Sequence, residues 1–180
     1  METISGSAHH ATGGNLVMLG GTMGVGKTAT GRALQKLLPA CAFLDGDWCW
    51  DMHPFVVNEA TKALVLGNIA YMLNSFLKCG QFQNIVFCWV LHEPEIWRQV
   101  LGRLNTQGWR VYRLALVCSP ASLCARLQKD IGAGLRAPDV VERSLARLPG
   151  YPGLGVPLLD TSCLTAAQAA RQIARELAAG

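Results

Sequence analysis

The sequence has few charged residues and no apolar run long enough to cross a membrane. Only 16% of its 180 residues are charged, whereas 51% are hydrophobic. The longest apolar runs, 16–19, 85–91 and 114–118, are far shorter than the ~20 residues that a membrane-spanning helix needs. Short, nearly continuous apolar runs are typical of parallel strands that helices cover on both faces. The composition therefore predicts a buried parallel sheet and no membrane association.

Two further absences concern location and redox state. The seven cysteines include no Cys-x-x-Cys pair, and the first 26 residues contain neither Lys nor Arg. The cysteine pattern favours reduced thiols over disulfides or a zinc site. A start without basic residues does not fit a secretory or transit peptide. We therefore expect a cytoplasmic protein in which residues 1–14 form a flexible tail and residues 15–180 form a single domain.

A concentrated basic surface is also missing. The net charge is +4, but Lys and Arg are scattered through the second half of the chain and form no stripe with interleaved aromatics. Nucleic-acid binding is therefore not expected. A mild positive excess suits a small anionic ligand.

Apolar strand patterns alternate with helical patterns along the chain. The strands are expected at 15–20, 41–44, 84–91, 110–118 and 156–160. The helices are expected at 27–38, 58–78, 94–105, 120–129, 138–148 and 165–177. Strands that alternate with helices predict a doubly wound α/β fold, in which ligands bind at the carboxyl ends of the strands.

A phosphate-binding loop joins the first expected strand to the first helix. The segment Gly21-Thr22-Met23-Gly24-Val25-Gly26-Lys27-Thr28 matches Gly-x-x-x-x-Gly-Lys-Ser/Thr in the strand–loop–helix context that the motif requires. Its backbone N–H groups and the helix N-terminus favour phosphate groups. We expect residues 21–28 and Thr30 to bind ATP, with Lys27 at the β- and γ-phosphates and the Thr28 hydroxyl on Mg²⁺.

Two carboxylates and a late basic segment accompany this loop. Asp45 and Asp47 follow the second strand on the same edge of the sheet, and Arg136 lies beside Gly132-Ala133-Gly134 in a segment rich in arginine. This order of motifs resembles the shikimate-kinase-like and gluconate-kinase-like branch of the nucleoside-monophosphate-kinase-type P-loop kinases. The resemblance covers nearly the whole chain from Asn15.

The resemblance implies a role for each of these residues. Asp47 would take or orient the proton of an acceptor hydroxyl, and Asp45 would help to hold Mg²⁺. Residues 131–148 would form a lid that carries Arg136 to the transferred phosphoryl group, and Arg126 would stack on adenine. The third strand departs from the family pattern because no Asp ends it, which favours Asp45 as the metal-holding carboxylate. The expected fold is a three-layer α/β/α sandwich with a five-stranded parallel sheet in the order 2-3-1-4-5.

Aromatic side chains follow the second and third strands and are expected to surround the acceptor. The candidates are Trp48, Trp50, Asp51, His53, Trp89 and His92, and the aromatic residues among them suit a flat or ring-shaped substrate. For the tryptophans, simple packing is the alternative interpretation. For the Asp pair it is a solvated turn, and for Arg126 it is the polar face of a helix.

The sequence thus predicts an ATP-dependent phosphotransferase whose acceptor is a small hydroxyl-bearing molecule. A nucleoside or nucleotide, a sugar acid such as gluconate, an antibiotic or a cyclohexene acid such as shikimate would fit equally well. The alternative is a nucleotide-binding switch or regulatory ATPase without a small-molecule acceptor. A third possibility, which the absence of an Asp at the end of the third strand leaves open, is an ATP-binding protein that has lost its catalytic activity. We expect a monomer or a homodimer.

Overall fold

A five-stranded parallel sheet forms the centre of the protein in the computed structural model, which describes residues 13–179. The strand order is β2-β3-β1-β4-β5, as predicted from the sequence. The strands are β1 (Asn15–Gly20), β2 (Cys41–Asp45), β3 (Asn84–Cys88), β4 (Arg110–Val117) and β5 (Leu158–Asp160). Residues 1–12 of the expected N-terminal tail lie outside the described residues.

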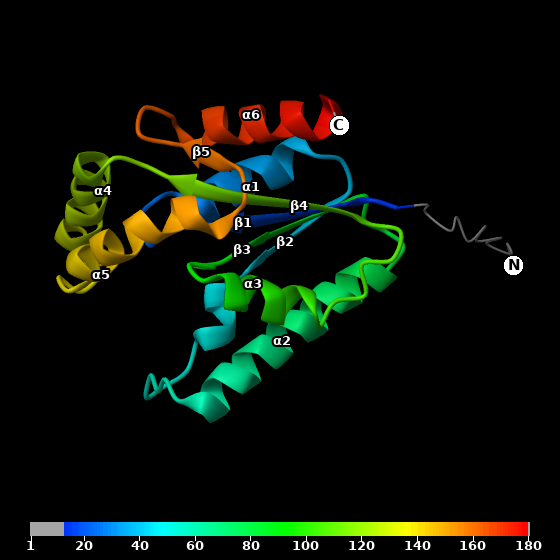
Figure 1. Cartoon of the computed structure of the whole chain (residues 1–180), viewed down its shortest axis with the longest axis horizontal. Coiled ribbons are helices and arrows are strands. Elements are labelled where there is room, and N and C mark those ends of the chain that lie inside the picture. The colour runs from blue at the N-terminus through cyan, green and yellow to red at the C-terminus, as the bar shows by residue number, and fades with distance from the viewer. Residues whose placement is uncertain (1–12, 180) are drawn as a thin grey trace, which may run out of the picture.

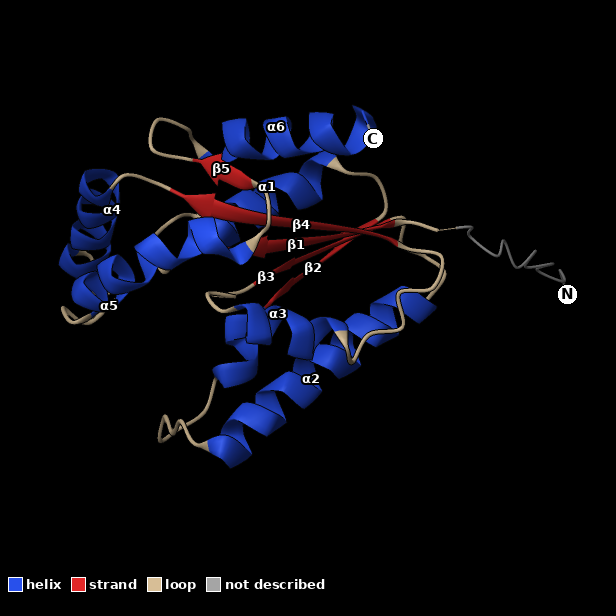
Figure 2. Cartoon of the chain, viewed as in Figure 1, coloured by secondary structure: helices blue, strands red, loops and turns tan. Residues whose placement is uncertain are grey.

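Helices cover both faces of the sheet (Figures 1 and 2). The α-helices are α1 (Lys27–Leu37), α2 (Glu59–Lys78), α3 (Pro94–Leu101), α4 (Pro120–Gly132), α5 (Val140–Arg147) and α6 (Ala166–Ala179). Two 3₁₀ helices span Gly46–Trp50 and Leu148–Leu154. Helices α1 and α6 pack on one face and α2 and α3 on the other, whereas α4 and α5 lie by the carboxyl ends of the strands (Figure 1).

The alternation of side chains along β1 explains why both faces are apolar. Leu16 and Met18 point into the core beneath α2 and α3, while Val17 and Leu19 point into the core beneath α1 and α6. Successive side chains of a strand point to opposite faces. A strand covered on both sides therefore needs the unbroken apolar run that the sequence shows. The predicted three-layer α/β/α fold is confirmed.

Helix α2 begins where the sequence predicted and buries part of the expected face. Asn58 caps it by accepting a hydrogen bond from the Thr61 N–H at 2.9 Å, and the Thr61 hydroxyl accepts one from the Asn58 backbone N–H. The sequence pattern places six residues on one apolar face: Leu64, Ile69, Met72, Leu73, Phe76 and Leu77. Ile69, Leu73 and Leu77 are buried as predicted, whereas Leu64 and Met72 are exposed and Val65 is buried in addition.

The third strand is shorter than predicted, and this matters for the site. It ends at Cys88 rather than at residue 91, after which the Trp89 N–H still donates to the Leu19 carbonyl at 3.1 Å. Leu91 then adopts a positive φ of 37°, so the chain turns away from the sheet. The apolar run continues past the strand because residues 89–92 line a cavity at the strand ends. Other element ends differ from prediction by a few residues, notably at β5, which begins at Leu158.

Within residues 13–179, no helix combines the length and the apolar character that crossing a membrane requires.

Candidate functional site

The phosphate-binding loop connects β1 to α1 and is held by backbone conformations that only glycine adopts easily. Gly21 has a φ of 147°, and a Cβ atom there would lie 2.8 Å from the Leu116 carbonyl oxygen, which is a backbone atom of β4. Gly24, at a φ of 79°, would press a Cβ atom against Leu127 of α4. The glycines therefore allow the loop to lie close against its neighbours.

Lys27 is buried at the start of α1, close enough to Asp45 and Asp47 for their charges to act on it. Its Nζ donates to the Thr22 carbonyl at 3.0 Å, so the side chain folds back over the loop. Burial lowers the pKa of Lys27 from its ordinary value, while Asp47, Cys88 and Asp45 oppose that shift. A buried cation beside a concave row of N–H groups is suited to phosphate oxygens.

Thr28 and Asp45 form a close pair. The Thr28 hydroxyl donates to Asp45 Oδ2 at 2.6 Å, and the other Asp45 oxygen accepts from the Asp47 N–H at 3.0 Å. Asp45 is 3% exposed. A hydroxyl and a carboxylate side by side fit Mg²⁺, which takes few protein ligands and keeps several waters. The described residues contain no larger group of acidic, His or Cys side chains that would hold a metal without help from a phosphate.

Asp47 lies two residues after Asp45 and lines a cavity. Burial by the surrounding protein raises the pKa of Asp47 from its ordinary value, although the carboxylate is exposed to the cavity itself. Lys27 opposes the shift most strongly, and Arg136 and a hydrogen bond from Trp89 oppose it too. A carboxylate beside a lysine, with a higher pKa than usual, is suited to accepting a proton from a substrate.

Trp89 packs over the residue between the two carboxylates. A Cβ atom at Gly46 would lie 2.6 Å from Trp89 Cγ. Only glycine therefore fits at this position while the indole stays in place. Trp89 thus contacts the Asp45–Asp47 segment directly, as expected for a residue at the end of β3.

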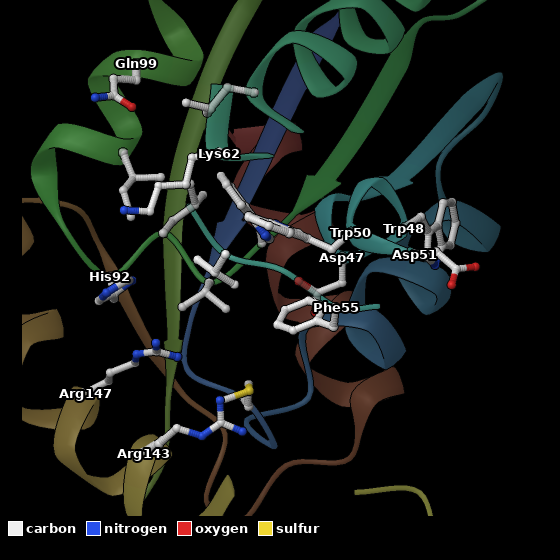
Figure 3. A pocket seen from close by; sticks show the side chains of 17 residues that line it. Asp47, Trp48, Trp50, Asp51, Phe55, Lys62, His92, Gln99, Arg143 and Arg147 are labelled. Atoms are coloured by element: carbon white, nitrogen blue, oxygen red, sulfur yellow. The ribbon is translucent and has the colours of Figure 1, made fainter. Parts of the chain in front are cut away.

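A cavity of about 850 Å³ includes Asp47 in its lining and lies at the carboxyl ends of the strands (Figure 3). The predicted residues Asp47, Trp48, Trp50, Asp51 and Trp89 all line it. Of the two predicted histidines, His92 lines the cavity and His53 does not. Further lining residues were not among the predicted substrate contacts: they include Met23, Phe55, Val57, Lys62, Leu66, Ile96, Gln99, Arg143 and Arg147. Their signal in the sequence was weak, because they come from helices and loops far apart along the chain.

Two of the predicted residues lie apart from the others. In Figure 3, Trp48 and Asp51 sit on the far side of Asp47 from Arg143 and Arg147. Trp48 meets Phe43 edge to face, with ring centroids 5.6 Å apart, and the Arg32 guanidinium lies 4.9 Å from its ring. Trp48 therefore packs against β2 as well as lining the cavity together with Trp50.

Arg126 binds the loop from the other side. Its guanidinium donates to the Val25 carbonyl at 3.1 Å, to the Thr161 hydroxyl at 3.2 Å and to the Thr161 carbonyl. A cavity of about 150 Å³ lies beside it and is lined by Thr30, Gly26 and Thr165 among others. The two predicted nucleotide contacts, Thr30 and Arg126, therefore share one pocket. Thr161 was missed because nothing near it in the sequence marks a ligand site.

The segment expected to form a lid contacts the loop directly. Arg136 pairs with Asp130 at 3.0 Å, and its charge is close enough to influence the pKa of Asp47. The Thr22 hydroxyl donates to the Ser144 carbonyl of α5 at 3.1 Å. Tyr151, in the 3₁₀ helix after α5, donates to the Val90 carbonyl at 2.7 Å, and the Gly21 N–H donates to the same carbonyl at 3.3 Å.

The sheet order, the loop between β1 and α1 and the carboxylates after β2 define a kinase-like P-loop fold. Solved structures share it along nearly their whole length. The tunicamycin resistance protein of Deinococcus radiodurans has a TM-score of 0.67 at 20% identity, covering 91% of this chain and 95% of that one. The shikimate kinase of Acinetobacter baumannii has a TM-score of 0.63 at 18% identity, with 96% and 98% covered. The gluconokinase of Sinorhizobium meliloti has a TM-score of 0.61 at 16% identity, with 93% and 97% covered.

The family follows from the sequence itself. The model of the AAA domain family matches residues 17–134, which is more than half of the chain, and the chain belongs to that family. No curated protein matches the sequence. The predicted resemblance to small-molecule P-loop kinases is confirmed, since shikimate kinase and gluconokinase are both among the similar structures.

Proposed function

We propose that the protein transfers the γ-phosphoryl group of ATP, with Mg²⁺, to a hydroxyl group of a small molecule. The observation that carries the proposal is the position of Asp47. It stands between the buried Lys27 of the phosphate loop and a cavity large enough for a second substrate. A nucleotide-binding switch has no need of such a cavity beside its phosphate site, so the phosphotransferase is favoured.

The residues of the loop would position the nucleotide. Backbone N–H groups of the loop after Gly21 and the Lys27 ammonium would bind the phosphates, and the Arg126 pocket would take the base. Thr28 and Asp45 would hold Mg²⁺, which supplies charge neutralisation between the β- and γ-phosphates. The short hydrogen bond between Thr28 and Asp45 keeps the hydroxyl oxygen and the carboxylate oxygen next to each other.

Asp47 would orient the acceptor and take its proton. The acceptor oxygen forms a bond to the γ-phosphorus, the bond from that phosphorus to the β–γ bridging oxygen breaks, and ADP leaves. The hydroxyl proton passes to Asp47. Arg136 would approach the transferred group when residues 131–148 close, and a guanidinium in that position stabilises the transition state.

Acceptor-stimulated release of ADP tests the proposal. Lys27→Met keeps most of the buried stem and removes the charge, so turnover should fall by ~10³-fold or more. Lys36→Met is the matched control, because Lys36 is exposed in the last turn of the same helix, and its turnover should equal that of the wild type. Tight ATP binding with no stimulation by any class of hydroxyl-bearing acceptor would instead support the switch.

A further inference from the structure

The cavity next to Asp47 is large and mostly apolar. Its volume of about 850 Å³ lies in the upper part of the range of ~300–1,000 Å³ that is usual for sites of drug-sized ligands. Aromatic and aliphatic side chains form its walls: Met23, Trp50, Phe55, Val57, Leu66, Trp89, Leu91 and Ile96. An acceptor that fills this space buries apolar surface against them.

Part of this wall stays uncovered in the free protein. Phe55 is 66% exposed and Val57 is 55% exposed, and both line the cavity. The Phe55 ring lies 5.8 Å from the Trp50 ring, with the two planes tilted by 49°. Large apolar groups gathered in a hollow are typical of a binding site, since a ligand removes them from water. The tilted pair offers ring faces to a planar apolar molecule.

Four polar side chains of the lining already have a partner for one of their atoms. Within residues 13–179, the pairs are Lys62 with Glu59 at 2.8 Å, Gln99 with Glu95 at 2.8 Å, His92 with Glu93 at 3.2 Å and Arg143 with Asp139 at 3.0 Å. Asp51 lies on the outer side beside Trp48 (Figure 3). A polyhydroxylated acceptor would leave several of its hydroxyl groups without partners here, which is costly when they are buried.

Asp47 and Arg147 make no ion pair within residues 13–179 and lie on different sides of the cavity, and His92 Nδ1 in the same lining is buried without a hydrogen-bond partner. Asp47 stands beside Trp50, and Arg147 extends from α5 near His92 (Figure 3). Burial lowers the pKa of His92 and the nearby Arg147 lowers it further, yet Arg147 makes no ion pair with any residue in the described part of the chain. A guanidinium binds a carboxylate through two parallel hydrogen bonds. One such group balances a single carboxylate charge better than the charge of ~−1.5 to −2 on a phosphate.

We propose that the acceptor is an alcohol built on an apolar ring system, with its hydroxyl group at Asp47 and a single carboxylate at Arg147. This inference rests on the proposed function and narrows its substrate class. The reaction is the same transfer: the ring-borne oxygen takes the phosphoryl group, ADP leaves and Asp47 receives the proton. The carboxylate takes no part in bond making and serves only recognition.

A graded set of aromatic hydroxy acids tests the inference. The probes are 4-(hydroxymethyl)benzoate, 6-(hydroxymethyl)-2-naphthoate and 4′-(hydroxymethyl)biphenyl-4-carboxylate, each with its carboxamide. Shikimate and gluconate serve as polar acids. Binding is measured by calorimetry on the protein loaded with a non-hydrolysable ATP analogue, and turnover is measured by ADP release.

We expect at least one aromatic acid to bind ~10-fold or more tightly than its carboxamide, since a hydrogen bond between charged partners is lost with the amide. Arg147→Gln should remove that preference and raise KM for the acid while leaving kcat and the KM for ATP nearly unchanged. Arg147→Lys should restore part of it. The matched control is Arg171→Gln on the exposed side of α6, which should behave as the wild type.

Two results would overturn the inference. One is that shikimate or gluconate binds as well as the best aromatic acid. If those polar acids also stimulate ADP release, the proposed phosphotransferase is supported and only the apolar ring of the acceptor is refuted. The other is that no aromatic acid binds in preference to its amide, or that Arg147→Gln retains the preference. Calorimetry measures acceptor binding without turnover. Absence of ADP release with an acid that binds would therefore refute the phosphotransferase and leave the binding preference standing.

Discussion

Arg126 holds the phosphate loop to the end of β5, and replacing it by alanine tests how much that contact stabilises the protein. The guanidinium donates to two carbonyl groups, those of Val25 and Thr161, and to the Thr161 hydroxyl. A hydrogen bond from a charged group contributes ~1.5–3 kcal/mol. The three bonds come from one half-buried side chain and do not add in full, so we expect Arg126→Ala to cost about 2–3 kcal/mol in all.

That cost corresponds to a fall in Tm of roughly 5–10 °C for a domain of this size. Thermal unfolding followed by circular dichroism measures it, and Arg175→Ala, on the exposed side of α6, is the control. Binding of ATP and of inorganic tripolyphosphate then separates two roles. A loosened loop weakens both ligands, whereas loss of adenine stacking weakens ATP alone. A Tm within ~1 °C of the wild type would refute the structural role that these hydrogen bonds imply.

Three other replacements give expected outcomes. Asp47→Asn should lower kcat by ~10²-fold or more while ATP still binds, and the acid limb of kcat/KM should lie above the ordinary Asp pKa of ~3.9 in the wild type and vanish in the variant. Full activity would exclude Asp47 as the base. Gly21→Ala should cost about 1–3 kcal/mol and weaken ATP binding, since its Cβ would strike the Leu116 carbonyl; calorimetry and unfolding curves measure both. Tyr151→Phe should lower stability by about 1 kcal/mol in denaturant unfolding, because the fully buried phenol loses its bond to Val90. An unchanged midpoint would contradict this.

The motifs that lie within a few residues of one another could be predicted from the sequence. The glycines and Lys27 of the loop need a strand before them and a helix after them, and the apolar periodicity supplies both. Asp45 and Asp47 follow the next strand, and parallel strands end at one edge, so their proximity to Lys27 followed from topology alone. The strand order and the three layers were correct for the same reason.

The contacts between distant segments could not be predicted. The Thr22 hydroxyl donates to the backbone carbonyl of Ser144, which lies 122 residues further along the chain. Arg126 donates to the hydroxyl and to the backbone carbonyl of Thr161, 35 residues further along. Backbone acceptors leave no trace in residue identity. Trp48 lines the cavity with Trp50 as expected, yet its ring also packs against Phe43, a contact that the sequence did not indicate. A short helical turn separates the two rings, and the periodicity of a loop does not reveal such a turn.

The contact between Gly46 and Trp89 makes two distant positions of the chain mutually dependent. The indole occupies the space that any side chain at position 46 would need, with Cγ, Cδ1 and Cβ of Trp89 all within 3.0 Å of a Cβ built there. A larger residue at position 46 is therefore tolerated only together with a smaller one at position 89. Relatives that keep the two carboxylates but separate them by alanine or serine must carry a different wall at the end of β3, and with it a cavity of a different shape.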